Sequence, residues 1–272
     1  MGHVVGAAAA WRVLGGSVTG AMHRRQHRAC DDAFGWHVDG AVVVAVTADG
    51  AGSRPGTSAF GAFTAVQAVL AAAERHDARD ADGVVERLFH AALSAVDDAA
   101  SGLGVAPDLL ATTLSVVVIT DAGMAVGQIG DGIAVLGSGD TIEAVAVGER
   151  PEHVNETVFL TTPGALSEHL RTFSTAVDAV DALALSTDGL RYQVLDDVAA
   201  NRPFAPFFRA AWTYARRTDA TADAVTTFLD EVDDQSGDDK TLVLAVRDRS
   251  GTAPATRCLS ARPLVCMPGG DR

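Results

Sequence analysis

The chain has 272 residues, 48% hydrophobic and 21% charged, so it is long enough to bury a large core and is not intrinsically disordered. Its net charge of −14 argues against a nucleic-acid or anionic-membrane partner, because clustered Lys and Arg bind phosphate backbones. The N-terminus is a poor secretory signal, and no apolar run reaches the ~18 residues that span a bilayer. We expect a soluble, cytoplasmic monomer that does not bind membranes.

The first half of the chain predicts short strands followed by two long helices. Strands are predicted at Arg12–Val18 and Phe34–Val38, and a fully buried strand at Gly40–Thr47. The segments Ser58–Arg75 and Asp82–Ser101 each place apolar residues on one helical face, which is typical of helices that cover a sheet.

The second half begins with a β-rich region, residues 111–160, whose Gly- and Asp-containing turns indicate an antiparallel meander. Further predicted elements are a strand at Ala182–Thr187, helices at Leu190–Asn201, Phe204–Arg216 and Ala220–Val232, and a last strand at Thr241–Val246. Strands in two groups with helices between them favour an α+β fold of two mostly antiparallel sheets covered by helices on both outer faces. We expect one domain over residues 1–249 and a flexible C-terminal tail over residues 250–272, which are rich in Pro, Gly and Arg.

Asp-Asp and Asp-Gly pairs lie at the ends of the apolar, β-branched strands. They are Asp31-Asp32, Asp49-Gly50, Asp131-Gly132, Asp188-Gly189 and Asp238-Asp239. A carboxylate at the rim of a buried strand is costly to desolvate unless it is paired or bound to a cation. Several such carboxylates converging on one place would therefore form a cation site, and hard oxygen ligands favour Mg²⁺ or Mn²⁺.

Six sequence blocks, in this order and spacing, resemble the metal-dependent serine/threonine protein phosphatases of type 2C, the PPM family, and its bacterial branch in particular. The blocks are Gly20-x-x-His23 with Cys30–Phe34, then Ala48–Ser53, Ala111–Leu114, Gly130–Gly132, Leu185–Gly189 and Asp238–Thr241. Asn155–Thr157 also resembles the bacterial branch. The resemblance covers roughly residues 15–247. It implies a four-layer α-β-β-α sandwich with a binuclear metal centre at one end of the two sheets.

The resemblance also implies roles for individual residues. Asp49 would bridge two Mn²⁺ or Mg²⁺ ions, the Gly50 carbonyl would bind one of them, and Asp188 and Asp238 would hold the first ion together with Asp49. These three carboxylates are the predicted catalytic residues. Two such ions can lower the pKa of a bridging water and stabilise charge on a phosphoryl group during in-line attack, so no side-chain nucleophile is needed.

Three further carboxylates complete the metal ligands that the resemblance implies. Asp31 occupies a position where the family usually has Glu or Gln, and Asp32 one where an Asp acts on the second ion directly or through water. Asp131 matches the carboxylate that, with Asp188, holds a third, weaker ion in bacterial members.

The sequence departs from the family pattern at two positions. Ala51 replaces the His that is a proposed general acid in many eukaryotic members, so water or another group would protonate the leaving alkoxide. His27 replaces the usual phosphate-binding Arg. We expect the adjacent Arg28 to bind substrate phosphate, with His27 as an alternative. Weaker candidates are His23, Arg24 and Arg54.

The three cysteines, Cys30, Cys258 and Cys266, form no CxxC pair, so we expect reduced thiols, and Cys30 is interpreted as a packing residue. Three functions remain open. The first is hydrolysis of phosphoserine or phosphothreonine on a protein substrate. The second is a catalytically weak or dead phosphatase-like module that binds phosphoproteins, and the third is hydrolysis of small phosphate monoesters.

Overall fold

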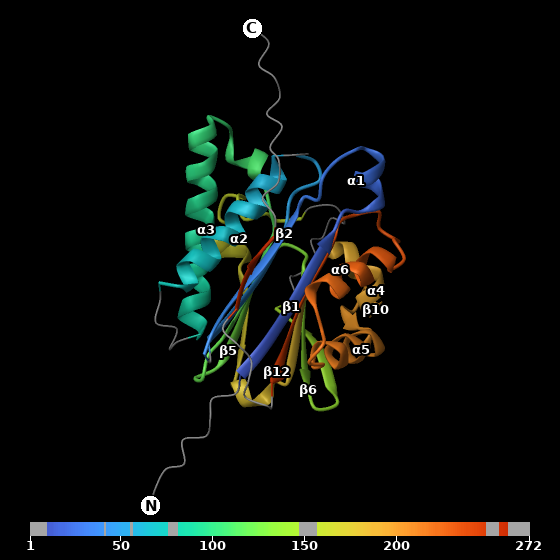
Figure 1. The fold of residues 1–272 in the computed structure, drawn as a ribbon. Coiled ribbons are helices and arrows are strands. Elements are labelled where there is room, and N and C mark those ends of the chain that lie inside the picture. The colour runs from blue at the N-terminus through green and yellow to red at the C-terminus, as the bar shows by residue number, and fades with distance from the viewer. Residues whose placement is uncertain are drawn as a thin grey trace, which may run out of the picture.

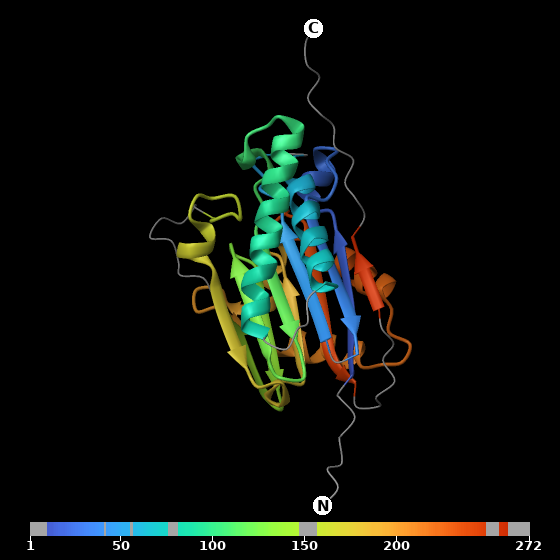
Figure 2. The same cartoon turned by 90° about the vertical axis from the view of Figure 1, so that its left-hand side faces the viewer.

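Two antiparallel sheets form the centre of the molecule and helices cover both outer faces (Figures 1 and 2). The computed structural model describes residues 10–40, 42–54, 57–75, 81–146, 157–248 and 256–260. The α-helices are α1 (Ala21–Arg25), α2 (Ser58–Ala73), α3 (Ala81–Leu103), α4 (Arg191–Val194), α5 (Ala205–Ala215) and α6 (Ala222–Glu231). None of the helices in these ranges has the length and apolar character needed to cross a bilayer. The predicted α-β-β-α sandwich is confirmed.

The first sheet has five strands in the order β1-β12-β9-β6-β7. Its strands are β1 (Ala10–Val18), β6 (Ile133–Ser138), β7 (Thr141–Val145), β9 (Ala182–Ser186) and β12 (Lys240–Asp248). Helices α4, α5 and α6 cover its outer face (Figure 1).

The second sheet has six strands in the order β13-β2-β3-β4-β5-β8. Its strands are β2 (Asp32–Asp39), β3 (Val42–Asp49), β4 (Leu114–Ile119), β5 (Met124–Ile129), β8 (Arg171–Thr175) and β13 (Thr256–Leu259). Helices α2 and α3 pack on its outer face (Figure 2). Short elements complete the fold: the single turns η1 (Pro107–Leu110), η2 (Ala165–His169), η3 (Val177–Ala179) and η4 (Asp188–Leu190), and a small hairpin of β10 (Leu195–Asp197) and β11 (Arg202–Pro203).

Strand β3 shows how the sequence builds three apolar layers. Successive side chains of a strand point to opposite faces. Val43 and Ala45 therefore lie between the two sheets, whereas Val44, Val46 and Ala48 pack against α2 and α3. A third apolar cluster lies between the five-stranded sheet and helices α5 and α6. Because both faces of the central strands are buried, their sequences are continuous apolar runs.

The structure corrects several expectations about individual elements. The predicted meander over residues 111–160 is divided between the sheets, since β4 and β5 pair in one and β6 and β7 in the other. The helix predicted at Leu190–Asn201 is a single turn, α4, followed by strand β10. Strand β8 was not predicted, because its residues alternate only between half-buried and exposed positions at a sheet edge.

The expectation of a flexible tail over residues 250–272 does not hold for Thr256–Leu259. These residues form β13, which pairs antiparallel with β2. The Ser260 N–H donates to the Phe34 carbonyl at 2.9 Å, and Arg257 forms an ion pair with Glu74 at 2.8 Å. Residues 249–255 and 261–272 lie outside the described residues.

Candidate metal centre

Five acidic side chains gather at one end of the sandwich, the end at which α1 lies (Figure 1). Asp32 begins β2 and pairs directly with Asp49, the last residue of β3. Asp188 follows β9, and Asp238 precedes β12, the strand that pairs with β9. Asp131 lies in the turn between β5 and β6. The fold thus brings the predicted carboxylates together from four separate parts of the chain.

Asp49 lies at the centre of this group. Burial raises the pKa of its carboxyl well above the ordinary value, and the negative charges of Asp32, Asp188, Asp238 and Asp131 raise it further, in that order. Burial likewise raises the pKa of Asp188 to about 6, with Asp131 and Asp238 as further causes. Without a cation, this arrangement favours protonated carboxyls, so a bound cation would stabilise the charged forms.

Two buried carboxylate oxygens in this group have no hydrogen-bond partner among the described residues: Oδ1 of Asp32 and Oδ1 of Asp188. The other oxygen of Asp32 accepts hydrogen bonds from the hydroxyls of Thr187 at 2.8 Å and Thr241 at 2.6 Å. An orphaned carboxylate oxygen is costly to bury. The two oxygens therefore fit the ligand set of a hard divalent cation such as Mg²⁺ or Mn²⁺.

The backbone of Asp49 is fixed by the block Ala111–Leu114. The Asp49 N–H donates to the Thr113 hydroxyl at 3.0 Å, and the Thr113 N–H donates to the Asp49 carbonyl at 2.8 Å. The Thr112 hydroxyl donates to the same carbonyl at 3.0 Å. Next to it, the Gly50 N–H donates to the Asp31 carbonyl at 3.2 Å, which ties the two acidic loops together. The threonines thus hold the central carboxylate in place.

Asp239, the second residue of the last acidic pair, has a different role from Asp238. Its buried carboxylate accepts hydrogen bonds from the N–H of Gly20 at 2.7 Å and the N–H of Asp31 at 2.5 Å, and it lies 2.9 Å from Nδ1 of His23. His23, Asp238 and Asp239 offer atoms close enough to share a metal ion. However, the Asp239 oxygens and His23 Nδ1 already bond one another and the backbone, so we assign these two residues a positioning role.

Two glycines allow the loops to approach Asp238 and Asp239. A Cβ on Gly20 would lie 2.3 Å from the Asp238 carbonyl carbon, and one on Gly189 would lie 1.9 Å from the Asp239 carbonyl oxygen. Neither separation is possible for a larger residue without moving the backbone. The glycines of the blocks Gly20-x-x-His23 and Asp188-Gly189 are therefore needed for close packing of the loops that carry the acids.

Asp31 and Asp131 lie at the edges of the group and each faces an arginine. Asp31 accepts a hydrogen bond from Arg28, and burial raises the pKa of Asp31 although Arg28 and His23 act in the opposite direction. Asp131 forms an ion pair with Arg191 at 3.3 Å. It also accepts a hydrogen bond from the Thr157 hydroxyl at 3.3 Å.

The predicted phosphate-binding side chains are mostly engaged in ion pairs. Besides Arg28, Arg24 pairs with Asp230 at 2.9 Å and Arg54 with Asp108 at 2.8 Å. His27 is exposed, with a backbone φ of 55° in the turn after α1. The sequence did not point to Arg191, which donates to the Asp131 carbonyl at 3.0 Å. Its positive charge partly opposes the rise in the pKa of Asp188. Its place one helical turn after Asp188 is the signal that would have found it.

Cys30 lies close to the acids but lacks the features of a nucleophile. Burial raises the pKa of its thiol well above the ordinary value, and the charges of Asp32 and Asp239 raise it further. Its sulfur lies 3.2 Å from the Ser17 hydroxyl. Among the described cysteines, Cys30 and Cys258 are both free. A thiol held in its protonated form is a poor nucleophile, which agrees with a packing role.

A family model described as Protein phosphatase 2C matches residues 19–230 of the chain. No curated protein sequence matches it.

Solved structures of bacterial phosphatases share the fold. The serine/threonine phosphatase Stp1 from Staphylococcus aureus is 15% identical with a TM-score of 0.62, covering 91% of this chain and 99% of Stp1. The catalytic domain of the serine threonine protein phosphatase PstP, solved in complex with two manganese ions, is 15% identical with a TM-score of 0.62 and covers 88% and 99% of the two chains. PppA of Pseudomonas aeruginosa is 16% identical with a TM-score of 0.59, covering 88% and 99%.

Proposed function

Because this chain belongs to the protein phosphatase 2C family, we propose that it hydrolyses phosphoserine and phosphothreonine in proteins with the help of two Mn²⁺ or Mg²⁺ ions. The observation that carries the proposal is the group of buried carboxylates around Asp49, with orphaned oxygens on Asp32 and Asp188. We further propose that the substrates are cytoplasmic phosphoproteins.

The proposed ligands of the first ion are Asp49, Asp188 and Asp238. Asp49 and the Gly50 carbonyl would also contact the second ion, on the side of Asp31 and Asp32. When bound, the ions supply a water of lowered pKa as the nucleophile and positive charge for the phosphoryl oxygens. Asp131, together with Asp188, would hold a third ion more weakly, since Asp131 is half-exposed and already paired with Arg191.

The chain's own cations would orient the substrate phosphate. Arg28 and Arg191 each contact a carboxylate at the edge of the acidic group, so each has a guanidinium near the place where the phosphate would bind. We propose Arg28 as the phosphate ligand, with His27 and Arg191 as the alternatives. Asp239 and His23 would keep the loop that carries Asp31 and Asp32 in register with Asp238.

The test is hydrolysis of p-nitrophenyl phosphate and of a phosphopeptide panel, each with and without Mn²⁺. We expect Mn²⁺- or Mg²⁺-dependent turnover of both substrates that EDTA abolishes and that thiol blockers leave unchanged, because burial raises the pKa of the Cys30 thiol and the mechanism uses no thiol. Turnover that survives complete metal removal would contradict the mechanism. Phosphopeptide binding without hydrolysis would favour the regulatory module, and hydrolysis confined to metabolites would favour the third function.

A further inference from the structure

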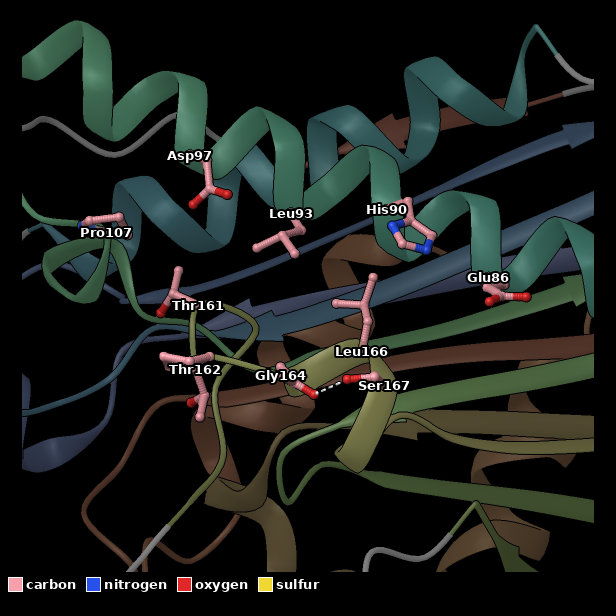
Figure 3. A pocket seen from close by; sticks show the side chains of 12 residues that line it. Glu86, His90, Leu93, Asp97, Pro107, Thr161, Thr162, Gly164, Leu166 and Ser167 are labelled. Carbon is pink, nitrogen blue, oxygen red and sulfur yellow. Dashed lines mark hydrogen bonds between the residues drawn. The ribbon is translucent and has the colours of Figure 1, made fainter.

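A groove separates helix α3 from the segment Thr161–Ser167 (Figure 3). Its volume is about 450 Å³. One wall consists of Glu86, His90, Leu93 and Asp97, which follow one another along a single face of α3. The opposite wall includes Leu166, which points toward the helix in Figure 3. We call this feature the α3 groove.

The lining of the α3 groove combines an apolar middle with acidic ends. Leu93 and Leu166 project into it from opposite walls (Figure 3). Glu86 and Asp97 lie at its two ends, and both are exposed. Neither carboxylate has an ion-pair or hydrogen-bond partner among the described residues, and none of the lining residues is Lys or Arg. Within the described part of the chain, the groove therefore offers two carboxylates without a basic partner beside an apolar surface.

The second wall of the groove is connected directly to the candidate metal centre. Thr161 follows Leu160, whose N–H donates to the Thr112 carbonyl at 2.8 Å. The Thr112 hydroxyl in turn donates to the Asp49 carbonyl at 3.0 Å. Farther back in the same segment, the Thr157 hydroxyl bonds Asp131 at 3.3 Å. The wall is thus linked by hydrogen bonds to Asp49 through Thr112 and to Asp131 through Thr157.

We propose that the α3 groove binds a basic segment of the phosphoprotein, so that the enzyme prefers substrates with Arg or Lys a few residues from the phosphorylated side chain. This specificity rests on the proposed function. An extended residue spans about 3.3–3.6 Å, so three to five residues of the substrate reach roughly 10–18 Å from the phosphorylated side chain. Arg and Lys supply both a cation for Glu86 and Asp97 and an aliphatic stem for Leu93 and Leu166.

The charge of the chain itself argues against a second copy as the occupant of the groove. With a net charge of −14, two copies repel one another, and an acidic groove is a poor site for an acidic surface. A basic peptide is attracted by the same field.

The experiment compares E86Q/D97N with the wild-type protein. Both substitutions remove charge from exposed side chains, so the variant should fold like the wild-type protein. The substrates are pairs of phosphoserine peptides of equal length, one with two Arg and its partner with two Gln at the same positions. In one pair these positions lie three to five residues before the phosphoserine, and in a second pair they lie three to five residues after it. We expect wild type to have a KM about three- to tenfold lower for an Arg peptide than for its Gln partner. E86Q/D97N should lose this difference while its hydrolysis of p-nitrophenyl phosphate stays unchanged.

The matched control is D98N/E231Q, which removes the same charge from exposed positions outside the groove, one of them next to Asp97 on α3. It should keep the preference for Arg. Equal KM values for both peptides in wild type, or a preference that survives in E86Q/D97N, would overturn the proposal.

Fluorescence anisotropy with an unphosphorylated Arg peptide separates this inference from the proposed function. Binding should weaken in E86Q/D97N and at high salt but not in the control variant. If that pattern appears in a protein without turnover, the groove assignment stands and the phosphatase proposal fails. If turnover occurs but the peptide binds wild type and E86Q/D97N equally, the groove assignment fails alone.

Discussion

At one end of the five-stranded sheet, the carboxyls of Asp188 and Asp238 crowd against Asp49, whereas at the opposite end four arginines line a cavity of about 690 Å³. These arginines, which come from β1, from α5 and its C-cap, and from β12, are Arg12, Arg209, Arg216 and Arg247. Three aspartates, Asp140, Asp181 and Asp248, line the same cavity, so the charges at that end are mixed, whereas the acidic end gathers charges of one sign.

The arginines donate to backbone carbonyls, and Arg247 also forms an ion pair with Asp178 at 3.6 Å. Arg209 donates to the Asp140 carbonyl at 3.2 Å, Arg216 to the Asp181 carbonyl at 3.2 Å and Arg247 to the Val180 carbonyl at 3.0 Å. At the acidic end, by contrast, oxygens of Asp32 and Asp188 lack any partner among the described residues. The arginines are therefore balanced by groups of the protein itself, whereas the orphaned oxygens at the acidic end are the ones that the proposed cations would bind.

The largest effect should come from Asp49→Asn. Loss of this central carboxylate should reduce metal-dependent hydrolysis of p-nitrophenyl phosphate by at least about a hundredfold, because it would contact both ions. The metal-free protein should be at least as stable as wild type, since one of several repelling carboxyls is gone. Wild-type rates in this variant would mean that the site is misplaced. The measurements are steady-state kinetics and thermal unfolding with EDTA.

The second test is the stability of the metal-free protein as a function of pH. The carboxyls of Asp49, Asp32 and Asp188 have folded-state pKa values above the unfolded value of 3.8, and that of Asp188 is about 6. The folded protein therefore binds more protons than the unfolded chain. The protonated carboxyls stabilise the fold below about pH 4, where they are fully protonated, and this contribution to the free energy of unfolding is lost as the pH rises through about 6, the folded-state pKa of Asp188.

The measurement is Tm between pH 5 and 7.5, with EDTA or with excess Mn²⁺. Tm in EDTA should fall with rising pH relative to Tm in Mn²⁺, so the stabilisation by Mn²⁺ should be greater at pH 7.5 than at pH 5. Asp188→Asn should reduce this difference. A metal effect that is independent of pH would contradict the electrostatic comparison.

An intermediate effect is expected from Asp239→Asn. The amide can accept fewer of the bonds from Gly20, Asp31 and His23, so the loop before β2 should be held less firmly. The Mn²⁺ concentration for half-maximal activity should rise about tenfold, as for other groups that orient metal ligands, with activity recovered at high Mn²⁺. His23→Gln should behave similarly. If His23→Gln instead abolishes activity at every Mn²⁺ concentration, then His23 takes part in the reaction itself and does not only position the loop.

The smallest effect should come from Arg209→Gln at the opposite end of the sheet. Arg209 is exposed and donates to a backbone carbonyl, so its loss should change the free energy of unfolding by no more than about 0.5 kcal/mol. Turnover and the Mn²⁺ titration should match wild type. A change in the metal titration would show that the two ends are coupled.

The acidic positions were predictable because each lies beside one end of a buried apolar run. Strand burial and a following Gly or Asp are both visible in the sequence, and the strands Gly40–Thr47 and Thr241–Val246 were found within a few residues of β3 and β12. The family resemblance supplied the expectation that these ends meet, which strand periodicity alone does not provide.

Other features depend on contacts between distant residues. The role of Asp239 arises from Gly20, His23 and Asp31, which are more than two hundred residues away in the chain. Strand β13 is only four residues long and forms by pairing with the edge of β2, so no local sequence pattern predicts it. The assignment of Arg28 to substrate phosphate could not include its bond to Asp31, since side-chain partners are not encoded in local spacing.

The docking of β13 has a consequence for the assembly of the protein. Without Thr256–Leu259, the backbone groups of Gly35–Val38 would form an open sheet border ready to pair with another chain. A chain cut after Asp248 would keep every proposed metal ligand and yet expose a template for aggregation. The segment Thr256–Leu259 would thus prevent aggregation by covering the edge of β2, the strand that begins with Asp32.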